Sequence, residues 1–224
     1  MYYVVYSIGP DGLRISPPHS QNAAGCVLFF GDSLTFGEGV GDEQTMPYRV
    51  GVKSAGRQRV YNFAFHGYGP HQMLAQLEQG VVRRTIACRP RHAIYQAIVP
   101  HIARAAGRTF WDKNGPRYRI APDGKIVFSG HFNDTPAAAL IDVLRLRDMR
   151  IYLRLFGDQR PYSSADIELF LGIVQRSRDV FRQQYPHAEF HVLLWHYGSD
   201  QDYDKVVHGL RARQLDVRAV DEIL

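Results

Sequence analysis

The chain has 224 residues, which is long enough for one well-buried α/β core and marginal for two domains. Its formal charge is +5, but the basic residues are scattered and form no dense stripe, so we expect no nucleic-acid partner. Hydrophobic residues make up 45% of the chain, which argues against a disordered protein. No stretch approaches the ~20 apolar residues that span a bilayer.

Residues 1–25 are predicted to form an extended arm, with a β-like start over residues 2–8 and a turn at Gly9-Pro-Asp-Gly12. This start has neither the basic region nor the apolar core of a signal peptide, so we expect a cytoplasmic protein by default. A periplasmic or secreted location stays open if the N-terminus is truncated. We expect Cys26 and Cys88 to be buried free thiols, with a single disulfide as the alternative.

Residues 26–224 are predicted to form one domain. Short apolar runs predict strands over residues 26–30, 59–65, 92–99, 189–195 and 217–223. Apolar residues at helical spacing predict helices over 71–84, 136–154, 163–184 and 201–214. This alternation indicates an α/β fold, a three-layer α/β/α sandwich with a mostly parallel five-stranded sheet. A Pro-Asp-Gly turn within residues 107–135 predicts an inserted β-hairpin.

In such sheets the functional site lies at the carboxyl ends of the strands. The most suggestive sequence there is Gly31-Asp-Ser-Leu-Thr-Phe-Gly37, which directly follows the first apolar run. A serine at this place is a candidate nucleophile, provided that a neighbouring base activates it. Backbone N–H groups beside it can stabilise a developing oxyanion. A simpler interpretation of the same residues is a glycine-rich turn that Asp32 and Ser33 cap.

The segment Gly31-Asp32-Ser33-Leu34, with Gly37 beyond it, resembles the first block of the SGNH (GDSL) hydrolases. The second block of that family is Asn-x-Gly-x-x-Gly. Residues 62–67 match its Asn and its last Gly, whereas Ala64 replaces the middle glycine. The resemblance covers roughly residues 26–80. It implies a flavodoxin-like sheet, Ser33 as the nucleophile, and an oxyanion hole formed by the N–H groups of Ser33 and Gly67.

The family's third block, Gly-x-Asn-Asp after the third strand, does not occur here. Gln96 has the right side-chain chemistry to replace its asparagine in the oxyanion hole. The Phe132-Asn133-Asp134 segment lacks the preceding glycine and lies in the predicted hairpin region, so we interpret it as a turn.

The fourth family block, Asp-x-x-His after the fifth strand, supplies the general base and the carboxylate that orients it. No such pair follows the last predicted strand, so we expect that the chain is truncated, that another residue is the base, or that the domain is not a hydrolase. Asp32 and three histidines follow predicted strands at the active edge and are candidates for substrate binding or for an alternative base: His66, His101 and His196.

The leading hypothesis is therefore a serine ester or acyl hydrolase that forms an acyl-enzyme on Ser33. Its substrate would be a small ester or an acylated carbohydrate, and no metal or organic cofactor is implied. Alternatives are an O-acyltransferase of the same fold, a catalytically incomplete binding domain, and a phosphate-binding turn in a flavodoxin-like fold. The last is disfavoured because the P-loop lysine is absent and Asp32 would repel phosphate. The oligomeric state is not predicted.

Overall fold

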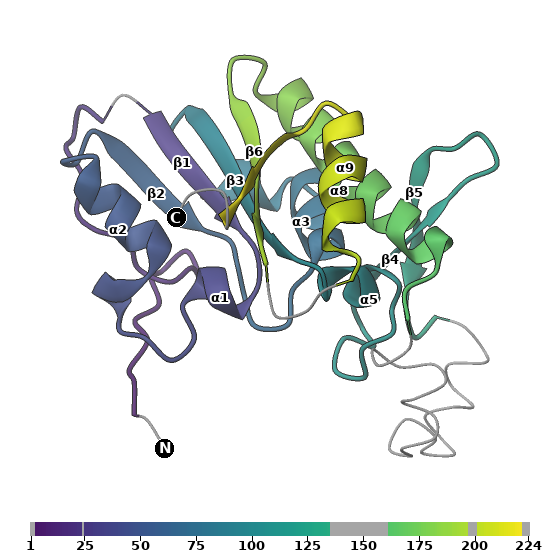
Figure 1. The fold of residues 1–224 in the computed structure, drawn as a ribbon. Helices are drawn as coiled ribbons and strands as arrows, with labels where there is room; N and C mark the ends of the chain where they lie inside the picture. The colour runs from purple at the N-terminus through teal and green to yellow at the C-terminus, as the bar shows by residue number, and fades with distance from the viewer. Residues whose placement is uncertain (1–2, 24, 135–160, 197–200, 221–224) are drawn as a thin grey trace.

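A five-stranded, all-parallel sheet forms the centre of the molecule (Figure 1). The computed structural model describes residues 3–23, 25–134, 161–196 and 201–220. The strands follow the order β2-β1-β3-β6-β7, and each neighbouring pair is parallel. Their bounds are β1 (Gly25–Phe30), β2 (Gln58–Asn62), β3 (Pro90–Ile98), β6 (Glu189–Trp195) and β7 (Asp216–Ala219). This sheet, which helices flank, confirms the predicted α/β class.

The two faces of the sheet are covered unequally. Because successive strand residues point to opposite faces, Leu28 joins the large core and Phe29 joins a smaller one. The large core includes side chains from α3 (Pro70–Glu78), α5 (His101–Ala105), α8 (Ser164–Gln184) and α9 (Tyr203–Ala212). The smaller core packs under α2 (Met46–Lys53), which lies beside β1 and β2. On β6 the side chains alternate between fully buried and partly exposed positions, which indicates that its second face is less covered.

The predicted hairpin is confirmed. Strands β4 (Pro116–Ile120) and β5 (Ile126–His131) pair antiparallel and extend away from the main sheet beside α8 (Figure 1). The buried ring of Tyr118 joins the large core, and its hydroxyl donates a hydrogen bond to Glu78 Oε2 over 3.0 Å. The hairpin is therefore attached to α3 as well as to α8.

Several boundaries differ from the predicted ones. The helix predicted over residues 71–84 is two helices, α3 and α4 (Val81–Thr85), because Gly80 adopts a left-handed conformation at φ 70° between them. Strand β2 ends at Asn62 rather than at residue 65, since the Asn62 side chain accepts a hydrogen bond from the Ala64 amide and turns the chain. The predicted helices over 163–184 and 201–214 are present as α8 and α9, and Ser163 caps α8. The helix predicted over 136–154 lies outside the described residues.

The N-terminal arm forms no strand over residues 3–8, and its one pairing is an isolated bridge between Ile8 and Arg14. The arm is attached to the domain by the buried guanidinium of Arg14 and not by sheet pairing. The guanidinium donates hydrogen bonds to the carbonyls of Phe36, Gly37 and Val40 and pairs with Asp42 at 2.8 Å.

Cys26 and Cys88 form a disulfide, so the expectation of free thiols was wrong and the alternative holds. The bond links the start of β1 to the segment that leads into β3, at the amino-terminal end of the sheet. Sequence spacing could not decide this, because 62 positions separate the two cysteines. Within the described part of the chain, every helix is too short or too polar to cross a membrane.

Candidate active site

Ser33 lies where β1 gives way to a short helix, α1 (Ser33–Phe36). Asp32 caps that helix by accepting a hydrogen bond from the Leu34 amide over 3.0 Å. A side chain at Gly31 would overlap Thr35 Oγ1, so the turn requires glycine. Within the described residues, the partly buried Ser33 hydroxyl makes no hydrogen bond. It is held by the backbone at the carboxyl edge of the sheet, without a side-chain partner.

The neighbouring strands hold α1 on both sides. From β2, Asn62 donates a hydrogen bond to the Thr35 carbonyl over 3.1 Å. From β3, Gln96 accepts one from the Thr35 hydroxyl over 2.6 Å. Gln96 is only 2% exposed, and its Nε2 has no partner among the described residues. The contact makes Gln96 a support of α1, and its predicted place in the oxyanion hole stays a proposal.

A buried ionic network lies behind Ser33. Asp32 Oδ2 is 3.2 Å from His101 Nε2 and 2.9 Å from Arg104 Nη1, and the other ring nitrogen of His101 is 2.7 Å from the Tyr95 hydroxyl. Burial alone would raise the pKa of Asp32, but the hydrogen bond from His101 and the positive charge of Arg104 hold that pKa well below its usual value. Burial lowers the pKa of His101 to about 4, against the opposing effect of Asp32. Near pH 7 the network therefore combines an ionised Asp32, a neutral His101 and a charged Arg104.

This network determines what His101 can do. Both of its ring nitrogens are engaged, one by Asp32 and one by Tyr95, and its side chain is fully buried. In this arrangement the ring holds Asp32 in place rather than presenting a free nitrogen to Ser33. Asp32 and His101 are candidates from the sequence, whereas Arg104 is not among them. The available signal was spacing, because Arg104 follows His101 by three residues on α5 and so shares its helix face.

Arg104 also joins the two sequence blocks. Its Nη1 donates to the carbonyl of Tyr68 over 2.6 Å as well as to Asp32. Tyr68 follows Gly67 directly, so one guanidinium fixes the turn after β2 relative to the turn after β1. The Ser33 and Gly67 segments are thereby held at the same edge of the sheet.

The backbone conformation and the surroundings of Gly67 leave no room for a side chain. Its φ of 72° is left-handed, and an added Cβ would lie 2.7 Å from Trp111 Nε1. Neither the Gly67 nor the Ser33 amide donates a hydrogen bond within the described part of the chain. Both N–H groups thus remain available to an oxygen atom of a ligand.

The side chain of Trp111 covers Gly67. Trp111 is not among the candidates from the sequence. Its loop is anchored by the next residue, Asp112. Asp112 Oδ2 lies 2.6 Å from His71 Nε2 and accepts a hydrogen bond from Gln72 over 2.8 Å. Burial of the His71 ring lowers its pKa, although the Asp112 carboxylate opposes this. No local motif indicated the contact, because the loop reaches α3 only in the folded chain.

The other two candidate histidines lie apart from the buried network. His66 Nδ1 is 3.2 Å from Glu38 Oε2, and its ring packs 4.5 Å from the ring of Phe36 at the end of α1. His66 Nε2 makes no hydrogen bond among the described residues. His196, just after β6, is exposed and packs against Tyr203 with the ring centres 4.6 Å apart.

Comparison with known proteins adds little to this geometry. No protein family of known description matches the chain, and no curated protein does. Among solved structures, the chain is similar to an acetyl xylan esterase (Est2A) from the rumen bacterium Butyrivibrio proteoclasticus. The two are 11% identical with a TM-score of 0.47, and the match covers 93% of this chain but 58% of that one. A similarity of this extent does not identify an activity.

Proposed function

We propose that the protein is a serine ester hydrolase of the SGNH type, with Ser33 as the nucleophile. The observation that carries this proposal is the placement of Ser33 on a strand-to-helix turn, next to the buried Asp32 network and with its own backbone N–H free of a partner among the described residues. A nucleophile needs exposure to substrate and a rigid backbone, and this turn offers both. The sequence resemblance to SGNH hydrolases supports the same role for Ser33 and Gly67.

In the proposed reaction, Ser33 Oγ attacks the carbonyl carbon of the ester while a base takes its proton. The N–H groups of Ser33 and Gly67 donate hydrogen bonds to the resulting oxyanion, and Gln96 is proposed as a third donor. The tetrahedral intermediate collapses, and the alcohol leaves with the proton. Water then attacks the acyl-enzyme and releases the acid. Asp32 acts by positioning, because its carboxylate is occupied with Leu34, His101 and Arg104.

The surface of this edge favours an apolar acyl group or the face of a sugar ring. Large apolar side chains are exposed next to the proposed catalytic groups, with Leu34 directly after Ser33 and Phe65 two residues before Gly67. Trp111 is 47% exposed where it covers Gly67. Exposed aromatic rings beside a polar centre are typical of small-molecule sites. We therefore propose a small ester or an acylated carbohydrate as substrate.

Of the three candidate histidines, His66 is the one we propose to test as base. A carboxylate engages its Nδ1, and its Nε2 carries no hydrogen bond among the described residues, which is the arrangement a Ser-His-acid base requires. His101 has both nitrogens engaged, and His196 packs on α9.

The decisive experiment is hydrolysis of short p-nitrophenyl esters by the protein and by Ser33→Ala, with fluorophosphonate labelling in parallel. We expect Ser33→Ala to reduce kcat by at least about 10³-fold and to abolish labelling. Among histidine variants, we expect His66→Ala to lower kcat and exposed His208→Ala to leave it unchanged. Full activity in Ser33→Ala would disprove the proposal.

A catalytically incomplete binding domain is the second candidate. It is favoured by one observation, that no histidine of the described residues hydrogen-bonds the Ser33 hydroxyl. This candidate predicts neither turnover nor labelling, but saturable binding of acylated sugars that Trp111→Ala weakens. An O-acyltransferase would label like the hydrolase and transfer the acyl group to an added sugar in preference to water.

We also propose an oxidising compartment, because disulfides persist there and are rare in the reducing cytosol. The support is the Cys26–Cys88 bond, which favours a periplasmic or secreted location over the cytoplasmic default. Thiol trapping in the cells that produce the protein tests this, and two free thiols in the native protein would contradict it.

A further inference from the structure

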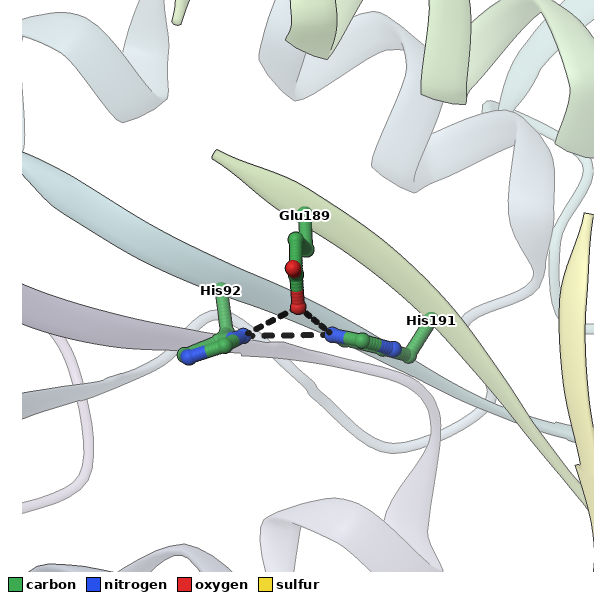
Figure 2. A group of neighbouring side chains, drawn as sticks. All are labelled: His92, Glu189 and His191. Carbon is green, nitrogen blue, oxygen red and sulfur yellow. Dashed lines mark hydrogen bonds and ion pairs between the residues drawn. The ribbon is translucent and has the colours of Figure 1, made fainter. Parts of the chain in front are cut away.

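A second group of histidines and carboxylates lies at the opposite end of the sheet from Ser33. His92 is near the start of β3, and Glu189 and His191 are at the start of β6. Figure 2 shows the three side chains pointing toward one another from the two neighbouring strands. His92 and Glu189 are paired in the parallel register, so the sheet itself brings the group together.

The three facing atoms form a nearly equilateral triangle. His92 Nδ1 is 3.1 Å from His191 Nε2, and each of these nitrogens is 3.4 Å from Glu189 Oε2. A tetrahedral zinc ion with bonds of about 2.0–2.1 Å holds its ligand atoms roughly 3.3–3.4 Å apart. The observed triangle therefore has the dimensions of one face of such a site.

The hydrogen-bond partners of the group suit a cation. His191 Nδ1 lies 2.6 Å from Asp216 Oδ2 on β7, so a neutral His191 ring that donates its Nδ1–H to Asp216 has the lone pair of Nε2 free for an ion. Asp216 is itself paired with Arg218 at 3.3 Å. Glu189 Oε2 offers a second electron pair, and His92 Nδ1 offers a third when the proton of that ring is on Nε2.

We propose that His92, Glu189 and His191 bind a divalent transition-metal ion of the zinc class, with Asp216 orienting His191. Two imidazole nitrogens and one carboxylate oxygen are a ligand set that zinc accepts, and the fourth position would hold water. A carboxylate that receives the outer N–H of a ligating histidine is the usual support of such a site. The side chains of His92 and Glu189 are 44% and 66% exposed, so an ion can enter from solvent.

This site is independent of the proposed hydrolase. It lies at the amino-terminal ends of β3 and β6, whereas Ser33 follows the carboxyl end of β1. Sequence spacing gave no indication of it, because Glu189 and His191 lie nearly a hundred positions from His92. Only the pairing of β3 with β6 joins them.

The test is titration of chelator-treated protein with ZnCl₂ by calorimetry, followed by replacement with Co²⁺, whose visible absorption reports tetrahedral ligands. We expect one equivalent of Zn²⁺ to bind and to raise the melting temperature. His191→Ala and Glu189→Gln should each weaken binding by at least about 100-fold, and Asp216→Asn by about 10–100-fold. Because the Glu189 side chain is exposed, Glu189→Gln should disturb folding least. This variant therefore still tests the proposal if His191→Ala is unstable.

His131→Ala is the matched control, because His131 pairs with Asp134 on the surface without a second histidine. We expect it to bind Zn²⁺ like the unaltered protein. Absence of binding to the unaltered protein would overturn the proposal, as would equal binding by Glu189→Gln. Ser33→Ala should bind Zn²⁺ normally, so the outcome is separate from that of the hydrolase experiment.

Discussion

The two ends of the sheet use the same residue types in opposite environments. At the carboxyl end, Asp32 and His101 are 2% and 0% exposed in their side chains, and Arg104 supplies the compensating charge. At the amino end, Glu189 and His191 are 66% and 26% exposed, and among the described residues no arginine forms an ion pair with Glu189. A buried charge must be paired, because an unpaired one loses several kcal/mol of hydration. Exposed charged groups need no such partner within the protein, because water solvates them, so they can remain available to a ligand.

The difference shows that a histidine–carboxylate contact has no fixed meaning. In the buried network both nitrogens of His101 are engaged by the protein, which makes the ring part of the scaffold. In the exposed group, one ring nitrogen of His191 contacts Asp216, and the other, Nε2, faces His92 Nδ1 and Glu189 Oε2. Burial and the second partner, rather than the first contact, separate structural from ligand-binding histidines.

The largest stability effect is expected from the buried network. Asp32→Ala should lower the free energy of unfolding by about 3–5 kcal/mol, because it leaves Arg104 and His101 without their shared acceptor. Urea unfolding measures this. The matched control, Asp123→Ala, breaks an exposed pair with Lys125 and should lower the free energy of unfolding far less. Similar losses in both variants would remove the distinction between buried and exposed pairs.

The amino end of the sheet is held covalently instead. Replacing Cys26 and Cys88 together by serine should lower the free energy of unfolding by about 2–4 kcal/mol. Without the bond, the unfolded chain is no longer cross-linked across a sequence separation of 62 and gains conformational entropy. Urea curves of the oxidised and the substituted protein give the difference. Coincident curves would mean that the ladder of β1 and β3 suffices without the bond.

The buried network also predicts a pH dependence. The pKa of His101 is about 4 in the folded protein against 6.5 for an ordinary histidine, so the unfolded chain binds this proton first as the pH falls. The contribution of the neutral His101 to the free energy of unfolding is therefore complete above pH 6.5 and is lost as the pH falls from 6.5 to about 4. The loss should reach about 2–3 kcal/mol at pH 4.

His101→Gln should be less stable at pH 7 but should show a flatter stability profile between pH 6.5 and 4. A residual slope is expected from His71, whose pKa is also lowered by burial. Urea midpoints at a series of pH values provide the measurement. An unchanged slope in His101→Gln would show that another group is responsible for the acid sensitivity.

The smallest effect is expected at the exposed group. Glu189→Gln should change the free energy of unfolding by less than about 0.5 kcal/mol in metal-free protein, because exposed ion pairs contribute little. With Zn²⁺ present, the unaltered protein should gain stability and the variant should not. A large loss without metal would indicate that the group is structural, like the Asp32 network.

The sequence by itself determined the parts of this protein that depend on local pattern. Apolar runs located the strands, and the segment 189–195 coincides with β6. Ser163 marked the start of α8, and the Pro-Asp-Gly turn marked the hairpin. The turn at Ser33 was visible because a strand, a glycine and a capping aspartate are adjacent in the chain. Local signals of this kind need only the backbone preferences of a few neighbouring residues.

Only the tertiary structure decided which residues are partners. The Cys26–Cys88 bond, the Arg104 bridge from Asp32 to Tyr68, and the Trp111 cover of Gly67 all join segments that are distant in sequence. Whether His101 supports the scaffold or offers a free nitrogen was likewise undecided until both of its contacts were placed. Pairing of β3 with β6 created the group around His191. Such contacts follow from burial and strand order, which depend on the whole chain at once, so no local pattern encodes them.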